Sequence, residues 1–435
     1  MTATDARGLE TTADSTEARD AVDSFCAELL RMGPDADRIL VAAEAHPECP
    51  LVQVDAALFM LYGCTQETTR ASEALLERAR KSARLPREHA WNEVVALWQR
   101  GDFEAVQDRC EAISREWPRD LVAVKVAEFQ YYLTGQYWTA ARFLKHAERI
   151  ADANDDSPHF ASIHAFALEL SERPDEAARL AQDAIDREAH NPWGHHALAH
   201  VHSRRAEPER GVAAMREFSK SWDDAGSAIR SHNFWHLAVL HIDRLETETA
   251  LSLHASGVFG CDREFSGIQL DAISLLWRIE MAGIEVTDAW AGVTEATLAL
   301  AGDFPMPYAA AHHAYLFART GEEAALEATL AAARRQAETT LPARREVWAR
   351  GGIDLVEGCA AFGQGDATRA VQCLETHIER VGASGGSDAQ IDLFHQTFLS
   401  ALIESGQLQR ADRLIRHRTA GRTATPLENS WLERL

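Results

Sequence analysis

The amino-acid sequence predicts an all-α protein built from stacked helical hairpins, an α-solenoid of the tetratricopeptide type. Along most of the chain, apolar residues recur every three or four positions, as they do on amphipathic helices, and few segments show the alternation of strands. Turn, aromatic and small residues then recur about every 35–40 residues, which is typical of helical repeats. Each hairpin of such an array buries its apolar face against its neighbours, and the array could also close into a superhelix.

The first clear repeat contains Gly101 at the turn between its two helices and Pro118 after the second helix. The next repeat keeps the phase, with Gly135 at the turn and small residues that let paired helices approach closely. A third repeat is centred on Ala177, where a glutamate replaces the turn glycine, and a fourth begins at Trp193. These phases predict helical hairpins in sequence order.

The two ends of the chain differ from the repeats. Residues 1–16 are polar and are expected to form a disordered tail. We expect a single helical-repeat domain over residues 17–418, whose first 60 or so residues cap the array. A glycine-rich loop is expected at residues 380–390, followed by a helix that begins at Ser387 or Asp388. Residues 419–435 are expected to form a loop and a short helix.

Composition limits the classes of partner. The net charge of -23, from 67 acidic and 44 basic side chains, argues against nucleic acid or an anionic membrane as the main partner. The seven cysteines contain no C-x-x-C pair, which suits a reducing compartment. The N-terminus lacks the pattern of a signal peptide, and no uncharged apolar stretch is long enough to span a bilayer. We therefore expect a cytoplasmic protein.

Two histidine pairs organise the middle of the chain. His196 and His200 are four residues apart, and so are His232 and His236. On a helix this spacing places both side chains of a pair on one face. If the two helices are neighbours, four imidazole rings converge.

Six motifs share this region and extend beyond it. They are A-F-A-L-E (165–169), N-P-W-G-H-H-A-L-A-H-V (191–201), H-N-F-W-H-L-A-V-L-H (232–241), L-D-A-I-S-L-L-W-R-I-E-M-A-G (270–283), H-A (313–314) and G-G-S-D-A-Q-I-D-L-F-H-Q-T (385–397). In these motifs and their order, from roughly Glu88 to Leu414, the chain resembles the tetratricopeptide repeat protein 38-like family. The resemblance implies an all-helical repeat fold. It implies no particular activity, because the family as a whole has no settled one.

The resemblance also singles out positions in this sequence. The matching positions are His196, His200, His232, Trp235, His236, Asp271, His313, Gln390, Asp392 and His395. Two positions depart from the family pattern. Ser203 stands where the family usually has an acidic residue, and Asp388 stands where its glycine-rich motif has a histidine. If the family uses that acid or that histidine in catalysis, the activity of this protein differs or is absent.

Histidines with carboxylates and tryptophans favour an interior pocket that binds a small molecule and chemically transforms it by general acid–base catalysis. The candidate catalytic residues are His196, His200, His232, His236, Asp271, His313 and His395. The candidate substrate-binding residues are Glu169, Trp193, Asn233, Trp235, Trp277, Gln390 and Asp392. These residue types admit binding with or without catalysis, so the sequence does not decide whether the protein is an enzyme.

Metal assistance is a further alternative for the same residues. A divalent transition metal would be held by the two pairs, His196 with His200 and His232 with His236. The spacing permits ligation without requiring it. Ala197 follows the first histidine where a zinc protease needs glutamate, so we do not infer that class of enzyme.

The competing interpretation is a protein–protein interaction scaffold. Tetratricopeptide arrays commonly bind peptides in a groove, and the histidines would then be structural, hydrogen-bonded in the interior of the array. An open groove would favour a peptide or protein partner. A closed cavity lined by histidines would favour the small-molecule ligand.

Overall fold

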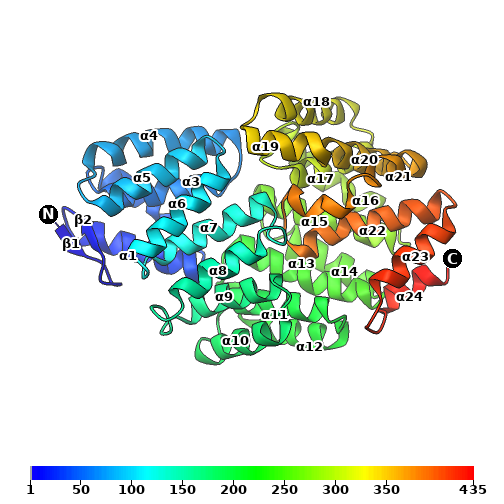
Figure 1. The fold of residues 1–435 in the computed structure, drawn as a ribbon, viewed down its shortest axis with the longest axis horizontal. Helices are drawn as coiled ribbons and strands as arrows, with labels where there is room; N and C mark the ends of the chain where they lie inside the picture. The colour runs from blue at the N-terminus through cyan, green and yellow to red at the C-terminus, as the bar shows by residue number, and fades with distance from the viewer. Residues whose placement is uncertain (1) are drawn as a thin grey trace. The chain divides into compact units, whose positions relative to one another are not determined.

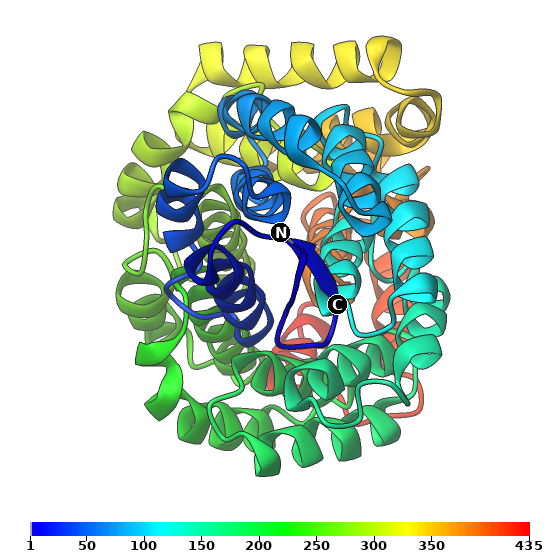
Figure 2. The same cartoon turned by 90° about the vertical axis from the view of Figure 1, so that its left-hand side faces the viewer.

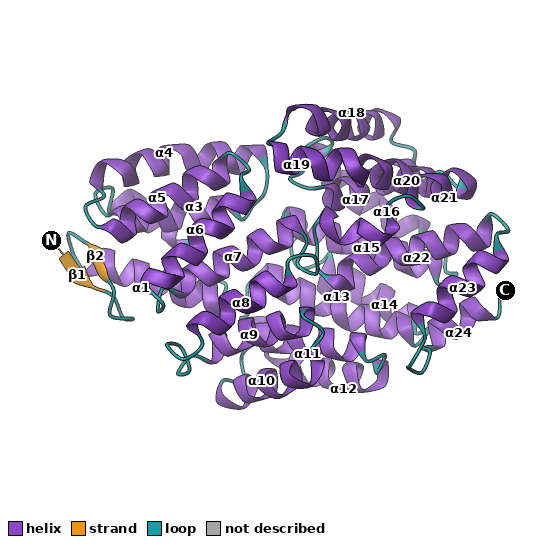
Figure 3. Cartoon of the chain, viewed as in Figure 1, coloured by secondary structure: helices purple, strands orange, loops and turns teal. Residues whose placement is uncertain are grey.

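The computed structural model describes residues 2–435. Within this range the chain forms twenty-four α-helices and one two-stranded sheet (Figures 1 and 3). The predicted all-α fold of tetratricopeptide type is therefore confirmed. Among the described residues, no helix combines the length and the apolar character needed to cross a membrane.

The chain divides into two compact units. Unit 1 comprises Met1–Ala197 with Asp224–Gly226, and unit 2 comprises Leu198–Asp223 with Ser227–Leu435. The sequence predicts a single helical domain over residues 17–418, whereas this division falls inside the helix Pro192–Arg204. A regular repeat gives no sequence signal for such a division, because each hairpin packs mainly on its neighbours.

Unit 1 consists of a strand pair followed by helical hairpins. Its elements are β1 (Thr2–Thr4), β2 (Glu10–Thr12), α1 (Thr16–Arg31), α2 (Arg38–Ala45), α3 (Pro50–Leu61), α4 (Gln66–Ser82), α5 (Pro86–Gln99), α6 (Phe103–Glu116), α7 (Leu121–Thr134), α8 (Ala140–Ile150), α9 (Pro158–Leu170) and α10 (Pro174–Arg187). The pairs α3 with α4, α6 with α7, and α9 with α10 pack extensively. The helix α11 (Pro192–Arg204) begins in unit 1 and ends in unit 2.

Unit 2 continues the hairpin pattern. Its helices are α12 (Pro208–Phe218), α13 (Ser227–Asp243), α14 (Thr247–Leu253), α15 (Ser266–Met281), α16 (Thr287–Thr297), α17 (Pro307–Thr320), α18 (Glu323–Thr339), α19 (Pro342–Val347), α20 (Ile353–Gly363), α21 (Ala367–Leu374), α22 (Asp388–Glu404), α23 (Leu408–Arg418) and α24 (Pro426–Leu432). Short 3-10 or π segments occupy Ser219–Asp224, His254–Val258, Leu298–Leu300, Trp348–Gly352 and Ile378–Ser384. Helix α13 packs on α15, and α15 packs on α22.

The connection within each hairpin passes through one residue in the left-handed conformation. These residues are Met32, Cys64, Gly101, Gly135, Glu172, Ala206, Leu245, Gly283, Gly321, Gly365 and Gly406, with φ between 51° and 96°. Only glycine adopts this conformation without steric cost, which explains why the turn glycines mark the repeat phase in the sequence. Where Glu172, Ala206 and Leu245 stand instead, the phase is harder to recognise.

Local sequence signals set several helix ends as predicted. Gly321, with φ 77°, ends α17, and Ser387 caps α22 through a hydrogen bond from the backbone N–H of Gln390 to its side chain. The Gln390 side-chain oxygen in turn accepts a hydrogen bond from the Ser387 N–H, which completes a capping box. Ser387 is therefore the N-cap residue, and Asp388 is the first residue of α22.

The N-terminal segment is ordered from residue 2, whereas its polar composition predicts a disordered tail. Strands β1 and β2 pair antiparallel, with Thr2 opposite Thr12 (dark blue in Figure 2). The Thr12 N–H donates to Glu88 of α5 at 2.6 Å, and the buried Asp5 carboxylate lies 3.2 Å from the Arg87 guanidinium group. Buried polar groups of α5 therefore hold the segment, and composition gives no indication of such long-range partners.

The C-terminal segment contains α24, which packs on α13 and α23. Its buried Glu428 accepts hydrogen bonds from Arg418 at 2.8 Å and from Arg422 at 2.7 Å.

Buried side chains of α11, α12, α13 and the segment Ser219–Asp224 form an apolar cluster of Ala199, Val212, Met215, Trp222, Leu237 and Leu240. This packing fixes α13, the helix that carries the second histidine pair.

Candidate functional site

Four helices of unit 2 bring polar side chains into a mostly apolar interior. Helix α11 contributes His200 and Arg204, and α13 contributes His232 and His236. Asp271 comes from α15, and the first turn of α22 contributes a further carboxylate. In both α11 and α13 the polar residues are four positions apart, so they lie on one helix face.

The first Asp–His pair joins α11 to α22. Nδ1 of His200 lies 2.9 Å from the Asp388 carboxylate, whose other oxygen accepts from Arg204 at 2.6 Å. Burial acts to raise the pKa of Asp388, but the charges of His200 and Arg204 outweigh it and lower that pKa. Because an ionised carboxylate can only accept, Nδ1 of His200 donates to Asp388.

The second Asp–His pair joins α13 to α15. Nδ1 of His232 lies 2.8 Å from the Asp271 carboxylate, which orients this ring in the same way. The His232 side chain retains 17% of its exposure and stacks on Trp235, with ring centres 5.3 Å apart. It is therefore the solvent-facing member of the histidine group.

His236 lies beside both pairs. Its ring centre is 4.6 Å from that of His200 and 4.8 Å from that of His232, and the residue is almost fully buried. Burial holds the pKa of His236 well below its usual value, and the neighbouring His200, His232 and Arg278 lower it further. The ring is consequently neutral at pH 7.

A buried ionic network continues from these residues along α15 and α22. The Arg278 guanidinium group is buried over the Trp235 ring, donates to the backbone carbonyl of Ala389 at 2.8 Å, and lies 3.9 Å from the Asp392 carboxylate. Asp392 also accepts from Arg418 at 2.9 Å. Burial opposes the ionisation of Asp392, but Arg418 and Arg278 outweigh it and lower its pKa.

Some predicted candidates lie in unit 1. His196 stacks on Trp193, with ring centres 4.4 Å apart and planes 22° apart, and its ring also contacts Phe166. The Lys125 ammonium group lies 3.6 Å from the centre of the Trp193 ring. Glu169 is fully buried on α9. The catalytic or binding roles of His196, Trp193 and Glu169 stay predictions.

Other predicted candidates lie elsewhere in unit 2, and their catalytic or binding roles stay predictions. Trp277 stacks face to face on Tyr315 with ring centres 3.6 Å apart, and His313 packs against the rings of Phe304 and Phe317. Burial lowers the pKa of His313 to about 4. Gln390 completes the α22 capping box, as described above. Asn233 is fully buried on α13, and burial lowers the pKa of His395.

Sequence reasoning missed the arginines of this network. Arg278 follows Asp271 by seven residues in an otherwise apolar helix, so it lies on the same face two turns later. A lone arginine in such a helix is itself a signal, because arginine is rarely buried without a partner. Arg204 and Arg418 follow polar stretches and carry no comparable signal.

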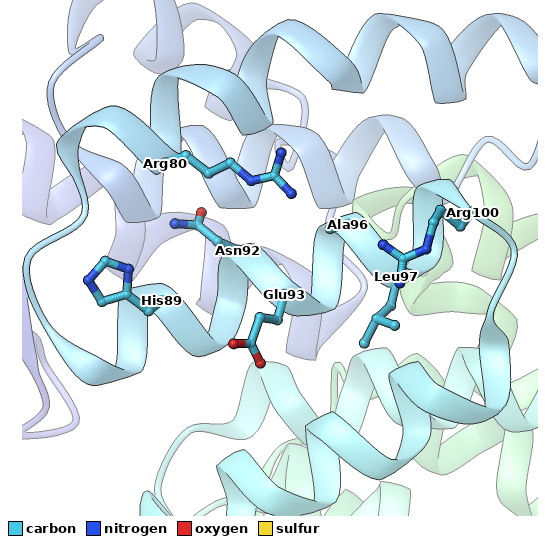
Figure 4. Close-up of a pocket in the computed structure, with 7 residues that line it drawn as sticks. All are labelled: Arg80, His89, Asn92, Glu93, Ala96, Leu97 and Arg100. Atoms are coloured by element: carbon cyan, nitrogen blue, oxygen red, sulfur yellow. The ribbon is translucent and has the colours of Figure 1, made fainter.

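A second polar feature lies on the surface of unit 1. Helices α4 and α5 form an open concave surface that encloses a volume of about 480 Å³ (Figure 4). The residues that line it are Arg80, His89, Asn92, Glu93, Ala96, Leu97 and Arg100. Asn92 is only 5% exposed, yet among the described residues neither its Oδ1 nor its Nδ2 has a hydrogen-bond partner. No sequence signal marks this surface, because its residue types are common on helix surfaces.

No family model matches the chain. A chain of the solved "Structure of Naa15/Naa10 bound to HypK-THB" is similar, at 11% sequence identity and a TM-score of 0.25. The match covers 93% of this chain and 64% of that chain.

Proposed function

We propose that the protein is a helical-repeat scaffold that binds an extended segment of a partner protein on the concave surface of α4 and α5. The observation that carries this proposal is the Asn92 carboxamide, which lines the surface with both of its polar atoms unpaired. An extended peptide backbone offers a carbonyl oxygen and an N–H group side by side. A carboxamide can donate to the first and accept from the second.

The depth of Asn92 strengthens this argument. A buried polar group without a partner costs about 1–3 kcal/mol, so such groups are rare unless they serve a purpose. In the free protein both polar atoms of this carboxamide are buried from solvent and have no hydrogen-bond partner among the described residues. A backbone that reached them would supply two directed hydrogen bonds, and it would exclude solvent from Ala96 and Leu97.

The charges around Asn92 indicate the kind of segment that fits. Figure 4 shows the Arg80 side chain near Asn92 and the Arg100 side chain farther along the lining, beside Leu97. Glu93, the one acid of the lining, is already paired with Arg109 at 2.8 Å. Arg80 is likewise paired, with Glu77 at 3.0 Å. The lining itself holds two arginines and one acid, a balance that favours acidic segments over basic ones.

A peptide array tests this function. Immobilised random peptides would be probed with the wild-type protein, with Asn92→Ala, and with Arg335→Ala as a matched control at an exposed position of α18. We expect acidic peptides to be selected, Asn92→Ala to weaken them about tenfold or more, and the control to bind normally, since each lost hydrogen bond contributes about 0.5–1.5 kcal/mol. Equal binding by Asn92→Ala would contradict the proposal.

We also propose that the chain belongs to the tetratricopeptide repeat protein 38-like family. Since no family model matches, the proposal rests on the histidine, tryptophan and glycine-rich motifs quoted above. It predicts that members of that family place these motifs on helices equivalent to α11, α13, α15 and α22. A member structure with the motifs on other helices would contradict it.

A second candidate function is the binding of a small molecule by the histidines of unit 2, with acid–base chemistry there. The two Asp–His pairs favour it, because a carboxylate on Nδ1 prepares the opposite nitrogen to take a proton. Native mass spectrometry of the purified protein tests it. A bound organic mass that is present in the wild type and lost in His232→Ala would support it, and its presence in both would contradict it.

A further inference from the structure

We propose that residues 2–14, the N-terminal strap, open as one unit while the helices of unit 1 stay folded, and that this opening exposes two buried thiols, Cys26 and Cys49, to electrophiles. The inference goes beyond the scaffold function. Arg87 and Glu88, which hold the N-terminal strap, do not line the concave surface of α4 and α5. The inference rests on the contacts of the strap and on the polar atoms that it buries.

The N-terminal strap contacts both thiols directly. The Arg7 guanidinium group donates to Sγ of Cys26 on α1, and Sγ of Cys49, the residue before α3, donates to the Thr12 carbonyl oxygen at 3.2 Å. Both cysteines are fully buried. Burial raises the pKa of Cys26 to about 12, although the charge of Arg7 opposes it, and burial raises the pKa of Cys49 to about 11. Because the thiolate is the nucleophile, both thiols are unreactive while the strap covers them.

Polar contacts hold the N-terminal strap, and little apolar packing supports them. Strands β1 and β2 have three residues each, and a two-stranded hairpin is at best marginally stable in water by itself. Ala13 is the one buried hydrophobic residue among residues 2–14. Asp5 lies 3.2 Å from the Arg87 guanidinium group, and Thr12 donates its N–H and its hydroxyl group to Glu88. Opening therefore breaks few contacts and exposes little apolar surface.

The N-terminal strap is also connected within itself. Oδ1 of Asp5 accepts from the backbone N–H of Arg7 at 3.0 Å and from that of Leu9 at 2.8 Å, which fixes the turn between the strands. The strands pair antiparallel, with Thr2 opposite Thr12. Because Arg7 and Thr12 belong to one connected hairpin, their contacts with the two thiols are lost together when the strap opens.

The closed position leaves polar groups of the strap without partners. Among the described residues, Nε and Nη2 of Arg7 and Oγ1 of Thr11 are buried and have no hydrogen-bond partner. Such groups disfavour the closed position, because water would form these hydrogen bonds in the open one. The strap is therefore held less tightly than the number of its contacts indicates.

Open space borders the N-terminal strap. A hollow of about 350 Å³ lies along one edge and is lined by Thr2, Thr12, Asp14, Glu48, Ser82 and Arg84. At the turn, a Cβ atom on Gly8 would meet no atom within 4 Å. Neither the edge nor the turn is tightly packed, so the strap can move outward without displacing a helix.

Modification of an exposed thiol would hold the strap open. An α,β-unsaturated carbonyl compound reacts when the thiolate sulfur forms a bond to its β-carbon, the electron pair of the alkene moves towards the carbonyl group, and the α-carbon takes up a proton. This addition needs no further reactant. The adduct would occupy the place of the Arg7 side chain at Cys26, or that of the Thr12 carbonyl at Cys49. The strap could then no longer close.

Maleimide labelling of the full-length protein tests the proposal. N-ethylmaleimide would be added under native conditions at one fixed pH, and the adduct on each cysteine would be followed by mass spectrometry of peptides. Cys110 on α6, an equally buried thiol of unit 1, is the internal reference. We expect Cys26 and Cys49 to be labelled at least about tenfold faster than Cys110, because opening of the strap costs less than opening of a helical hairpin. Labelling of either thiol no faster than that of Cys110 would overturn the proposal.

Variants of the strap identify the motion. Asp5→Asn keeps the side-chain size but removes the charge that faces Arg87, and it should accelerate labelling of both Cys26 and Cys49 about tenfold or more. Glu10→Gln, at an exposed carboxylate of β2, is the matched control and should be labelled as the wild type is. Equal labelling rates in Asp5→Asn and Glu10→Gln would overturn the proposal.

A milder variant decides the question if Asp5→Asn fails to fold. Thr12→Val removes only the hydroxyl group that donates to Glu88 at 3.1 Å, and it should also accelerate labelling of both thiols. Unchanged rates would overturn the proposal.

Trypsin digestion tests whether modification holds the strap open. Cleavage after Arg7, whose side chain the closed strap keeps 14% exposed, should be faster in the labelled protein than in the unlabelled one. Equal cleavage in the two would show that the strap closes over the adduct, and would overturn that part of the proposal.

Discussion

Asp388 shows how a single residue can join distant parts of a repeat protein. One oxygen of its carboxylate is hydrogen-bonded to His200 and the other accepts from Arg204, so Asp388 connects the start of α22 to the end of α11. An acidic residue here orients the His200 ring, a task that an imidazole would perform through a different tautomer.

Asp243 gives a prediction at the residue scale. Burial raises its pKa to about 7, and nearby Asp392 and Glu428 add to the shift against the opposing charges of Arg418 and Arg278. A folded-state pKa above the unfolded value means that the carboxyl group destabilises the fold increasingly as pH rises from about 4 to 7. Asp243→Asn removes this effect.

Urea unfolding of both proteins at pH 5 and pH 8 measures the effect. We expect the stability gained by Asp243→Asn to be larger at pH 8 than at pH 5 by at least about 1.4 kcal/mol, the equivalent of one pKa unit. This value is smaller than the full pKa shift would give, because Asp243 is partly exposed and solvent screens its charge. The same gain at both pH values would show that Asp243 ionises normally.

Part of the site was predictable from residue spacing. The four-residue interval in each histidine pair placed His200 and His236 on inward helix faces, and the resemblance added Asp271. The contact of His200 with Asp388 spans 188 residues, and no spacing rule reaches that far. Trp277 is predicted as a site residue from its chemical type and His313 from the resemblance. Both contact aromatic rings, and their roles in a site stay predictions.

At the scale of elements, the left-handed turn residue is the unit of the repeat. Because Gly101 and Gly135 occupy that position, the hairpins around them are recognisable from sequence. The strand pair β1–β2 was not, since its partners Arg87 and Glu88 lie on a helix more than seventy residues away. Local signals predict local elements, and they fail where a distant polar partner orders the segment.

Two substitutions test the turn. Leu245 has φ 61° and is 41% exposed. Leu245→Gly should raise the free energy of unfolding by about 1 kcal/mol, because glycine adopts the left-handed conformation without steric cost. Gly101→Ala at the equivalent position should destabilise by a similar amount, although the added methyl group meets no atom within 4 Å. Thermal unfolding of both variants provides the measurement. Shifts of the same sign would contradict the assignment of a common turn.

At the scale of the whole molecule, buried neutral histidines occur in both units. Burial lowers the pKa of His146 to about 3 in unit 1, and those of His312 and His254 to about 3 and 4 in unit 2. A folded-state pKa below the unfolded value of about 6.5 means that each contributes stability that is present above pH 6.5 and is lost as pH falls. For each of these histidines, the free energy of unfolding falls by about 1.4 kcal/mol for every pH unit between the unfolded and the folded pKa.

The protein should therefore lose stability between pH 6.5 and 4.5, before most carboxylates titrate. The three histidines together outweigh the opposite dependence of Asp243. Circular dichroism during thermal unfolding at half-unit pH steps would show a falling midpoint across this range. A midpoint that stays constant down to pH 4.5 would contradict the burial of these rings.

The central claim is that the concave surface of α4 and α5 receives an extended acidic segment. The most direct measurement is photo-crosslinking of an array-selected peptide that carries a photoreactive residue, followed by mass spectrometry of the crosslinked protein. The account predicts crosslinks within residues 66–100, around Asn92, and their loss in Asn92→Ala. Crosslinks confined to unit 2, or unchanged by that substitution, would contradict it.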